Sequence, residues 1–158
     1  MPAAPVTVRF PSGSDHAEWL RMRTLLWPDC PEEDHRREMC GYAGGGGRAA
    51  AFVAEDGSGT LCGFAEAALR EIAEGCDSRP AGYLEGIYVL PEFRARGIGR
   101  ALAAAAERWA ASRGCTEMAS DCLHDNEAGI RFHRGIGYGI TEQLIHFRRR
   151  IGREEQGE

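Results

Sequence analysis

The sequence predicts an α/β fold, because strand-like segments alternate along the chain with segments whose apolar residues recur at helical spacing. A length of 158 residues with 43% hydrophobic residues suits one compact domain with its own core. A strand, a glycine-rich loop and a helix follow one another near the middle of the chain, and no internal repeat or linker interrupts the pattern. We therefore expect residues 1–158 to form a single domain.

The N-terminal third is expected to hold one strand and two helices. Val6–Phe10 has the composition of a strand, and Ser12–Asp15 supplies capping side chains for the helix that follows. Trp27–Pro28 ends that helix, because proline disfavours helical backbone in the residue before it. A second helix is expected over Glu32–Cys40, since the four consecutive glycines beyond it cannot sustain regular structure.

An antiparallel hairpin is expected next. Its strands are Ala49–Glu55 and Leu61–Glu71, and the turn Asp56–Gly59 between them is rich in turn-forming residues. The stretch Ile72–Ala81 reads as irregular. The hairpin thus supplies two neighbouring strands of the sheet.

The remaining chain is expected to alternate strands and helices. Tyr83–Leu90 is strongly strand-like, and a helix follows the proline at its end. Glu117–Asp121 is a further strand, and Glu127–Ile136 is a helix closed by a glycine. Ile140–Phe147 is expected to be the last strand, before a charged tail.

Composition excludes several classes of protein. A net charge of -5 argues against a nucleic-acid-binding protein and favours a cationic small-molecule or protein partner. Six cysteines without a signal-peptide pattern indicate free thiols in the cytoplasm. No C-x2-C pair is present, and His124 and His133 are too far apart for a zinc motif, so no metal site is expected. No apolar run approaches the roughly 20 residues of a membrane span, so no membrane association is expected.

The segment Arg94–Gly99, Arg-Ala-Arg-Gly-Ile-Gly, carries the most informative chemistry. Glycines let the backbone approach an anion, and the free N–H groups at the start of a helix bind phosphate oxygens. The segment lacks the Gly-Lys-Ser/Thr of a Walker A loop, and Leu102 stands where a Rossmann fingerprint needs its third glycine. A pyrophosphate-binding loop is therefore indicated, although glycines at a helix start also serve as a simple turn.

This segment resembles the Q/R-x-x-G-x-G/A acetyl-CoA signature of the GNAT superfamily, and the expected strand precedes it. The resemblance implies a GNAT fold with a mixed central sheet flanked by helices, and acetyl-CoA as co-substrate. Pantetheine would lie against the backbone of Ile87 and Val89, with Asn126 as a further hydrogen-bonding residue. The residues implied at the CoA phosphates are Arg94, Arg96, Gly97, Ile98, Gly99 and Arg100.

A narrower resemblance extends over most of the chain. Five segments are together similar to the chromosomal-type aminoglycoside 6'-N-acetyltransferases: Leu26–Pro28, Gly75–Ser78, Leu84–Ile87, Glu117–Asp121 and Phe132–His133. The resemblance implies a homodimer that transfers acetyl to the 6'-amine of drugs such as kanamycin or tobramycin.

An aminoglycoside carries several ammonium groups, which need carboxylates to replace their water. Glu85 lies inside an otherwise apolar strand, where a carboxylate is costly unless it faces a partner or ligand. Asp121 is the last residue of the expected strand Glu117–Asp121. Asp77 lies in a loop, where acidic residues are common. Trp27 is either a wall of the acceptor site or a core tryptophan. These four are the candidate substrate-binding residues.

The expected mechanism is direct transfer in a ternary complex, with Asp121 and Glu85 as the candidate catalytic carboxylates. An acyl-cysteine intermediate at Cys115 or Cys122 is disfavoured, because neither has an evident base beside it in sequence. His133 stands where many GNAT enzymes carry a tyrosine, and it receives no role. Two alternatives stay open: a polyamine or protein amine as acceptor, and a non-catalytic CoA-binding module.

Overall fold

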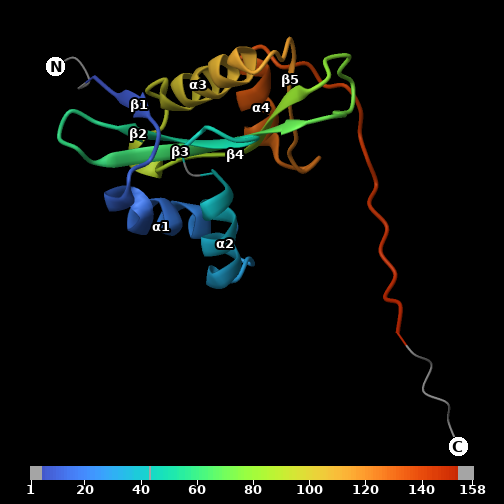
Figure 1. The fold of residues 1–158 in the computed structure, drawn as a ribbon, viewed down its shortest axis with the longest axis horizontal. Coiled ribbons are helices and arrows are strands. Elements are labelled where there is room, and N and C mark those ends of the chain that lie inside the picture. Colours follow the sequence, from blue (N-terminus) through green and yellow to red (C-terminus); the bar gives the residue numbers. More distant parts are fainter. Residues whose placement is uncertain (1–4, 43, 153–158) are drawn as a thin grey trace, which may run out of the picture.

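The computed structural model describes residues 5–42 and 44–152 and contains five strands and four α-helices in this part of the chain (Figure 1). The strands are β1 Thr7–Arg9, β2 Ala49–Glu55, β3 Leu61–Arg70, β4 Ala81–Val89 and β5 Met118–Ser120. The helices are α1 His16–Leu26, α2 Glu32–Tyr42, α3 Ile98–Ser112 and α4 Glu127–Gly135, with short 3-10 turns at Gly13–Asp15 and Pro91–Phe93.

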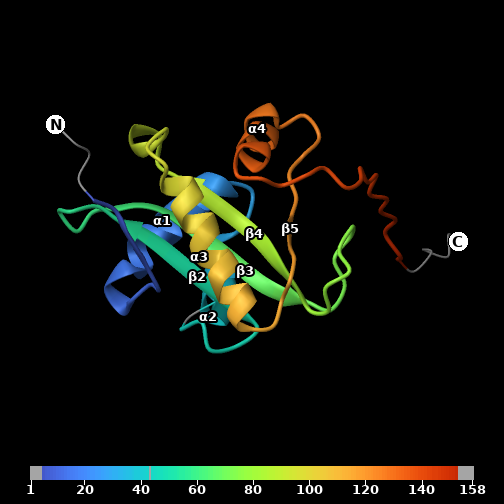
Figure 2. The same cartoon turned by 90° about the horizontal axis from the view of Figure 1, so that it is seen from above.

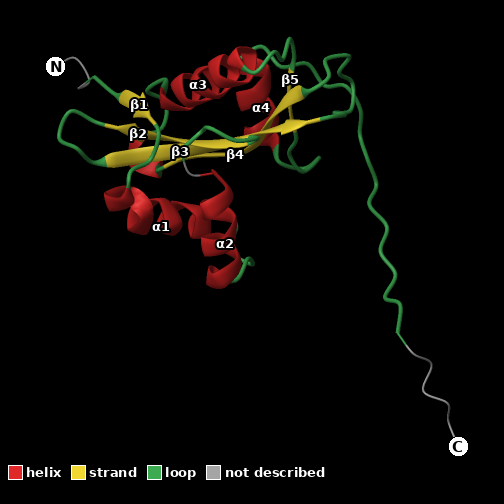
Figure 3. Ribbon diagram, in the orientation of Figure 1, coloured by secondary structure: helices red, strands yellow, loops and turns green. Residues whose placement is uncertain are grey.

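The strands form one mixed sheet in the order β1-β2-β3-β4-β5. The first four are antiparallel neighbours, whereas β5 runs parallel to β4. Helices α1 and α2 cover one face of the sheet, and α3 with α4 lies on the other (Figure 3). The predicted α/β architecture, a mixed central sheet flanked by helices, is confirmed.

Each face of the sheet has its own core. On one side the apolar stripe of α3, which includes the fully buried Leu102, packs against β2, β3 and β4. On the other side Trp19 and Met22 of α1 pack with Met39 of α2 against Phe64 of β3. Burying such side chains contributes roughly 1.5–3 kcal/mol each. No helix in the described residues is both long and apolar enough to cross a bilayer.

Two irregularities in the sheet prepare a site along β4. Across β3 and β4, Glu66 pairs with Gly86 but Ala67 pairs with Leu84, so Glu85 is an extra, bulged residue. The pairing of β4 with β5 ends at Leu84 and Ser120. Beyond that point, among the described residues, β4 continues to its end paired with β3 and no longer pairs with β5.

The predicted strand Ile140–Phe147 is wrong. The chain after α4 passes Gly75, where Thr141 touches the β3–β4 loop, and then runs out from the fold without joining the sheet (Figure 1). Phe147 is 92% exposed. The segment has strand composition, but a strand also needs a neighbour to accept its backbone hydrogen bonds, and among residues 5–42 and 44–152 no strand pairs with it.

Candidate active site

The glycine loop places free backbone donors at the start of α3. Ala95 and Gly97 both adopt left-handed backbone, with φ of 58° and 79°. The first helical hydrogen bond runs from Ala101 N–H to Gly97 O at 3.0 Å, so the preceding N–H groups of the first turn have no helical acceptor. Open space surrounds the Gly97 Cα, because a Cβ placed there meets nothing within 4 Å. This backbone is shaped for close approach of an anion.

Gly99 serves a different purpose from Gly97. A Cβ on Gly99 would lie 2.8 Å from Phe132 Cε2, so its missing side chain lets α4 pack against α3. Arg100 strengthens the same contact, because its Nη2 donates to Gly135 O at 2.7 Å. Two residues predicted to contact phosphate thus also join two helices.

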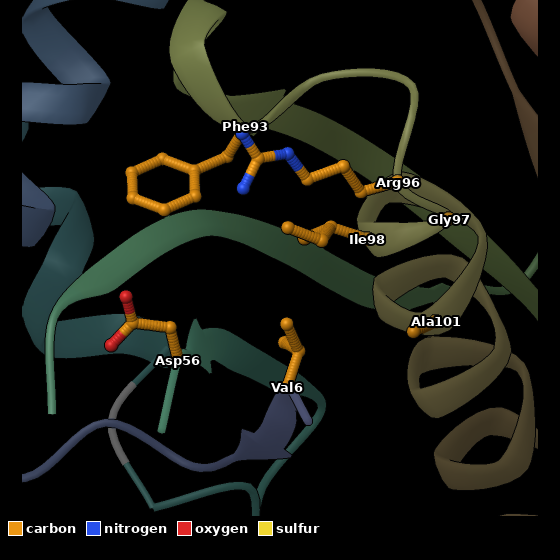
Figure 4. Close-up of a pocket in the computed structure, with 7 residues that line it drawn as sticks. All are labelled: Val6, Asp56, Phe93, Arg96, Gly97, Ile98 and Ala101. Carbon is orange, nitrogen blue, oxygen red and sulfur yellow. The ribbon is translucent and has the colours of Figure 1, made fainter. Parts of the chain in front are cut away.

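The side chains of Arg94 and Arg96 fold back and donate to backbone carbonyls that precede the loop. Arg94 Nε donates to Val89 O at 2.9 Å, and Arg96 Nη2 donates to Glu92 O at 2.8 Å. Figure 4 shows Arg96 extending toward Phe93. Both residues line a cavity of about 290 Å³. The cavity is lined by Val6, Asp56, Phe93, Arg96, Gly97, Ile98 and Ala101. The structure therefore gathers three of the predicted cofactor residues at one cavity, while Gly99 and Arg100 face α4.

The predicted pantetheine residues lie where β4 and β5 separate. Ile87 and Val89 belong to the part of β4 beyond the last β5 pair. Figure 2 shows β4 and the chain after β5 diverging toward α4, which Asn126 caps by accepting the Gly129 N–H at 2.9 Å. Ser120 marks the point of separation, since its hydroxyl lies 3.1 Å from Leu84 O.

His133 is fully engaged in this structure. Its Nε2 lies 2.8 Å from Ser120 Oγ and its Nδ1 lies 2.7 Å from Gly129 O. Since a carbonyl only accepts, Nδ1 carries a proton. The imidazole thus fixes α4 to the end of β5, which is a structural contribution to the site.

The candidate catalytic carboxylates are brought together by two side chains that the sequence did not reveal. Arg70 Nε and Nη2 donate to both oxygens of Glu85, at 3.0 and 2.8 Å. The same guanidinium lies 3.4 Å above the ring centre of Tyr83, whose hydroxyl donates to Asp121. Burial raises the pKa of Tyr83, and its hydrogen bond to the Asp121 carboxylate adds to the rise, so Tyr83 remains a neutral donor.

A weak signal for this network exists in the sequence. Tyr83 and Glu85 are two residues apart on one strand, and Arg70 ends the neighbouring strand opposite Ala81. The register of the two strands decides whether side chains at such positions meet on one face of the sheet. The bulge at Glu85 changes that register, and residue composition alone did not predict it.

Trp27 lies against β4 beside the bulge. A Cβ on Gly86 would overlap the Trp27 indole, and the indole packs edge-on against Phe64 with ring centres 6.2 Å apart. Trp27 also lines an open groove of about 560 Å³, together with Leu26, Pro28, Asp29, Cys30 and Glu38. It is therefore both a packed residue and a wall of a groove.

Asp77 stands apart from the other candidates. It lies on the exposed β3–β4 loop, where the N–H groups of Asp77 and Ser78 donate to Glu117 Oε1 at 2.6 Å each. Within the part of the chain that the structure describes, no hydrogen bond connects its carboxylate to Glu85 or Asp121. The same part of the chain holds no cluster of three or more side chains suited to a metal ion.

Comparison with known proteins places this geometry in a family. The model of the acetyltransferase (GNAT) family matches residues 16–138. The aminoglycoside N(6')-acetyltransferase type 1 of Klebsiella aerogenes is 40% identical over 94% of this chain and 99% of its own length. The protein of the same name from Stenotrophomonas maltophilia is 37% identical over 94% of this chain and 95% of its own.

Solved structures agree with the sequence relatives. AAC(6')-Iy in complex with the bisubstrate analogue CoA-S-monomethyl-acetylneamine superposes with a TM-score of 0.87 at 36% identity, covering 94% of this chain and all of that one. AAC(6')-Ih from Acinetobacter baumannii gives 0.85 at 34% identity, with the same coverage. The chain thus belongs to the GNAT acetyltransferases and, within them, to the aminoglycoside 6'-N-acetyltransferases.

Proposed function

We propose that this protein transfers the acetyl group of acetyl-CoA to the 6'-amino group of an aminoglycoside. The observation that carries the proposal is the network of Arg70, Tyr83, Glu85 and Asp121 at the place where the pairing of β4 with β5 ends. The network holds one guanidinium and two carboxyl groups, and this excess of acidic groups suits a cationic acceptor. The names of the relatives and of the solved structures support the same acceptor.

Asp121 is the better candidate for the proton acceptor. Both oxygens of Glu85 are held by the fork of Arg70, whereas Tyr83 occupies only Oδ2 of Asp121. In the proposed reaction the neutral amine attacks the thioester carbonyl, and Asp121 takes the proton that the nitrogen loses. The C–S bond then breaks and the CoA thiolate leaves. Glu85 binds and orients the acceptor as an ammonium-binding group.

On the cofactor side, the backbone of Ile87 and Val89 would hold pantetheine, with Asn126 beside it. The loop from Arg94 to Arg100 would hold the phosphates through its free N–H groups and guanidinium groups. Arg94 now occupies Val89 O, so we expect it to turn to a phosphate when acetyl-CoA binds.

A thiol-release assay with acetyl-CoA tests the function. Kanamycin and tobramycin should be acetylated. An analogue with a 6'-hydroxyl should not, since a hydroxyl lacks the charge and nucleophilicity of the amine. Spermidine and a lysine peptide, which represent the alternative acceptors, should not be acetylated either. NMR of the product locates the acetyl group. All 19 basic residues are arginine, so acetylation of the enzyme's own lysines cannot contribute to the signal.

Each outcome of this assay selects one hypothesis. Acetylation at another ring position would retain the enzyme class and reject 6'-specificity. Turnover of spermidine or the peptide alone would transfer the function to those amines. Tight CoA binding without turnover of any amine would favour the non-catalytic module.

We further propose a homodimer. Support comes from the C-terminal segment, which projects exposed apolar side chains away from the fold: Ile140, Leu144, Ile145, Phe147 and Ile151. A second copy would give this segment the strand neighbour that the described part of its own chain does not provide. Light scattering should give a dimer mass, and Ile145→Ser with Phe147→Ser should shift it toward the monomer. A monomeric unmodified protein would reject the proposal.

We also propose a cytoplasmic location. The six cysteines are unpaired in the structure, which supports a reducing compartment. Fractionation of expressing cells would test the location, and recovery of the protein outside the cytosol would reject it.

A further inference from the structure

A second charged cluster lies on the α1–α2 side of the sheet, centred on Arg23. This side chain is only 1% exposed, and its Nη1 donates to both oxygens of Glu66 at 2.9 and 3.1 Å. Its Nε donates to His35 Nδ1 at 3.3 Å, and its Nη2 pairs with Glu38 of α2. Trp19 adds a further donor to Glu66, at 3.0 Å. One arginine thus joins α1, α2 and β3.

The same guanidinium lies against Trp27, which lines the open groove of about 560 Å³. The Arg23 Cζ lies 4.9 Å from the ring centre of Trp27. The Trp27 indole also contacts Phe64 and Gly86. Gly86 pairs with Glu66 across the sheet. Moving Arg23 would therefore remove a contact of the Trp27 indole and the ion-pair partner of Glu66, which lies opposite Gly86.

The two carboxylates that share Arg23 differ in exposure. Glu66 is sealed at 1% exposure, and burial raises its pKa while Arg23 acts against the rise. The side chain of Glu38 is 55% exposed and lines the groove with Trp27 and Asp29. Since Glu66 already gives the buried guanidinium a partner of opposite charge, packing alone does not require a second carboxylate at the surface.

Glu38 also differs from the other acids of its helix. Glu33, for example, is paired with Arg37 one turn away on the exposed face, as is usual for a solvated helix. Tyr42, at the end of the same helix, has a pKa raised by burial and by the nearby charges of Glu66 and Glu85. Glu85 directly precedes Gly86, which lies against the Trp27 indole and pairs with Glu66, so the Arg23 cluster adjoins the Glu85 site along β4.

We propose that Arg23 is a positioning residue that holds Trp27 and the Glu38 carboxylate in the groove, and that Glu38 binds an acceptor ammonium other than the amine that is acetylated. The inference rests on the proposed function and adds a specificity-determining residue to it. An exposed carboxylate fixed from behind by a buried arginine loses less side-chain entropy on binding a cation than a free one does.

The test compares Glu38→Gln with Glu33→Gln, a change of the same chemistry on the same helix. With kanamycin as acceptor, Glu38→Gln should raise the acceptor KM about ten-fold, the range for a partly exposed charged hydrogen bond. The kcat and the acetyl-CoA KM should stay unchanged, and the rise of KM with NaCl should become less steep. Glu33→Gln should match the unmodified protein in all four quantities.

Arg23→Lys tests the positioning role. Lysine keeps the charge but loses the fork and the stacking on Trp27. It should raise the kanamycin KM at least as much as Glu38→Gln does, because it loses the contacts with both Trp27 and Glu38. Adding Glu38→Gln to Arg23→Lys should cause no further loss, because the lysine variant no longer holds Glu38 in place. If Arg23 has only a structural role, Arg23→Lys should lower the melting temperature and leave the ratio of the kanamycin KM to the acetyl-CoA KM unchanged.

The outcomes separate this inference from the function on which it rests. Calorimetric binding of kanamycin to the CoA-loaded protein gives a readout independent of turnover. An unmodified protein that acetylates kanamycin, with an unaltered KM and Kd in Glu38→Gln, overturns this inference alone. Failure of the unmodified protein to bind or acetylate any aminoglycoside overturns both.

Discussion

The cofactor side and the acceptor side of the site are built in opposite ways. At the cofactor side, the contiguous loop before α3 presents backbone N–H groups, and its shape depends on two left-handed residues, Ala95 and Gly97. At the acceptor side, side chains from β3, β4 and the end of β5 meet through Arg70, Tyr83 and Asp121. A site made of backbone leaves a local sequence motif, whereas a site made of distant side chains leaves only scattered residues.

The two sides also differ in how they are charged. Around the loop, the start of α3 has free N–H donors, and Arg94, Arg96 and Arg100 lie beside them, each donating to a backbone carbonyl. Around β4, Arg70 pairs with Glu85, and Asp121 accepts from the neighbouring Tyr83, so two carboxylates stand beside one guanidinium. Changes on one side should therefore leave binding on the other side intact, and this separation is what the following experiments test.

The largest effect is expected from Asp121→Asn. The amide keeps the hydrogen bond from Tyr83 but cannot take a proton, so kcat/KM for kanamycin should fall roughly a hundred- to a thousand-fold. Glu85→Gln should cost about ten- to a hundred-fold, mainly in acceptor KM, because the fork of Arg70 loses its anion. Steady-state kinetics with each substrate varied in turn measures both.

Acetyl-CoA affinity serves as the internal control for these variants. It should stay unchanged, because in the described part of the chain no hydrogen bond joins the loop before α3 to Glu85 or Asp121. A parallel loss of acetyl-CoA affinity would show that the cofactor side and the acceptor side are coupled, and would contradict their independence. Full activity of both variants across the pH range would place the amine site elsewhere.

The fold was predictable where local patterns determine it. The strand, glycine loop and helix around residues 83–112 follow from composition, spacing and phosphate chemistry, and the hairpin β2–β3 follows from its turn. The segment at Ile140–Phe147 was not predictable as it stands, because strand composition says nothing about whether a neighbouring strand is present. Pairing is a property of the whole chain, or of two chains.

The candidate site was predictable only in part, for the same reason. Glu85 attracted notice because a carboxylate inside an apolar strand is costly. Arg70 and Glu38 did not, because an arginine at a strand end and a glutamate on a charged helix look like ordinary surface residues. Their partners became visible only with the register of β3 against β4 and the packing of α2 beside α1.

A smaller effect, on the other side of the comparison, is expected at Gly97 and Gly99. Gly97→Val forces a β-branched residue into left-handed backbone and fills the open space at the start of α3. The acetyl-CoA KM should rise about ten-fold or more at a stability cost of about 1–3 kcal/mol, while kanamycin binding stays normal. Unchanged acetyl-CoA kinetics in a folded Gly97→Val protein would remove the phosphate role from this loop.

Gly99→Ala provides the matched contrast, because the added methyl meets Phe132 rather than open space. We expect it to lower the melting temperature by loosening α4, with its effect on acetyl-CoA arising through that movement. Adding Phe132→Ala should then recover part of the acetyl-CoA affinity, since it makes room for the methyl. The same second change should give no recovery in Gly97→Val, whose defect lies in the loop itself. Equal recovery in both backgrounds would mean that the two glycines act through one contact, and the distinction between a phosphate glycine and a packing glycine would fail.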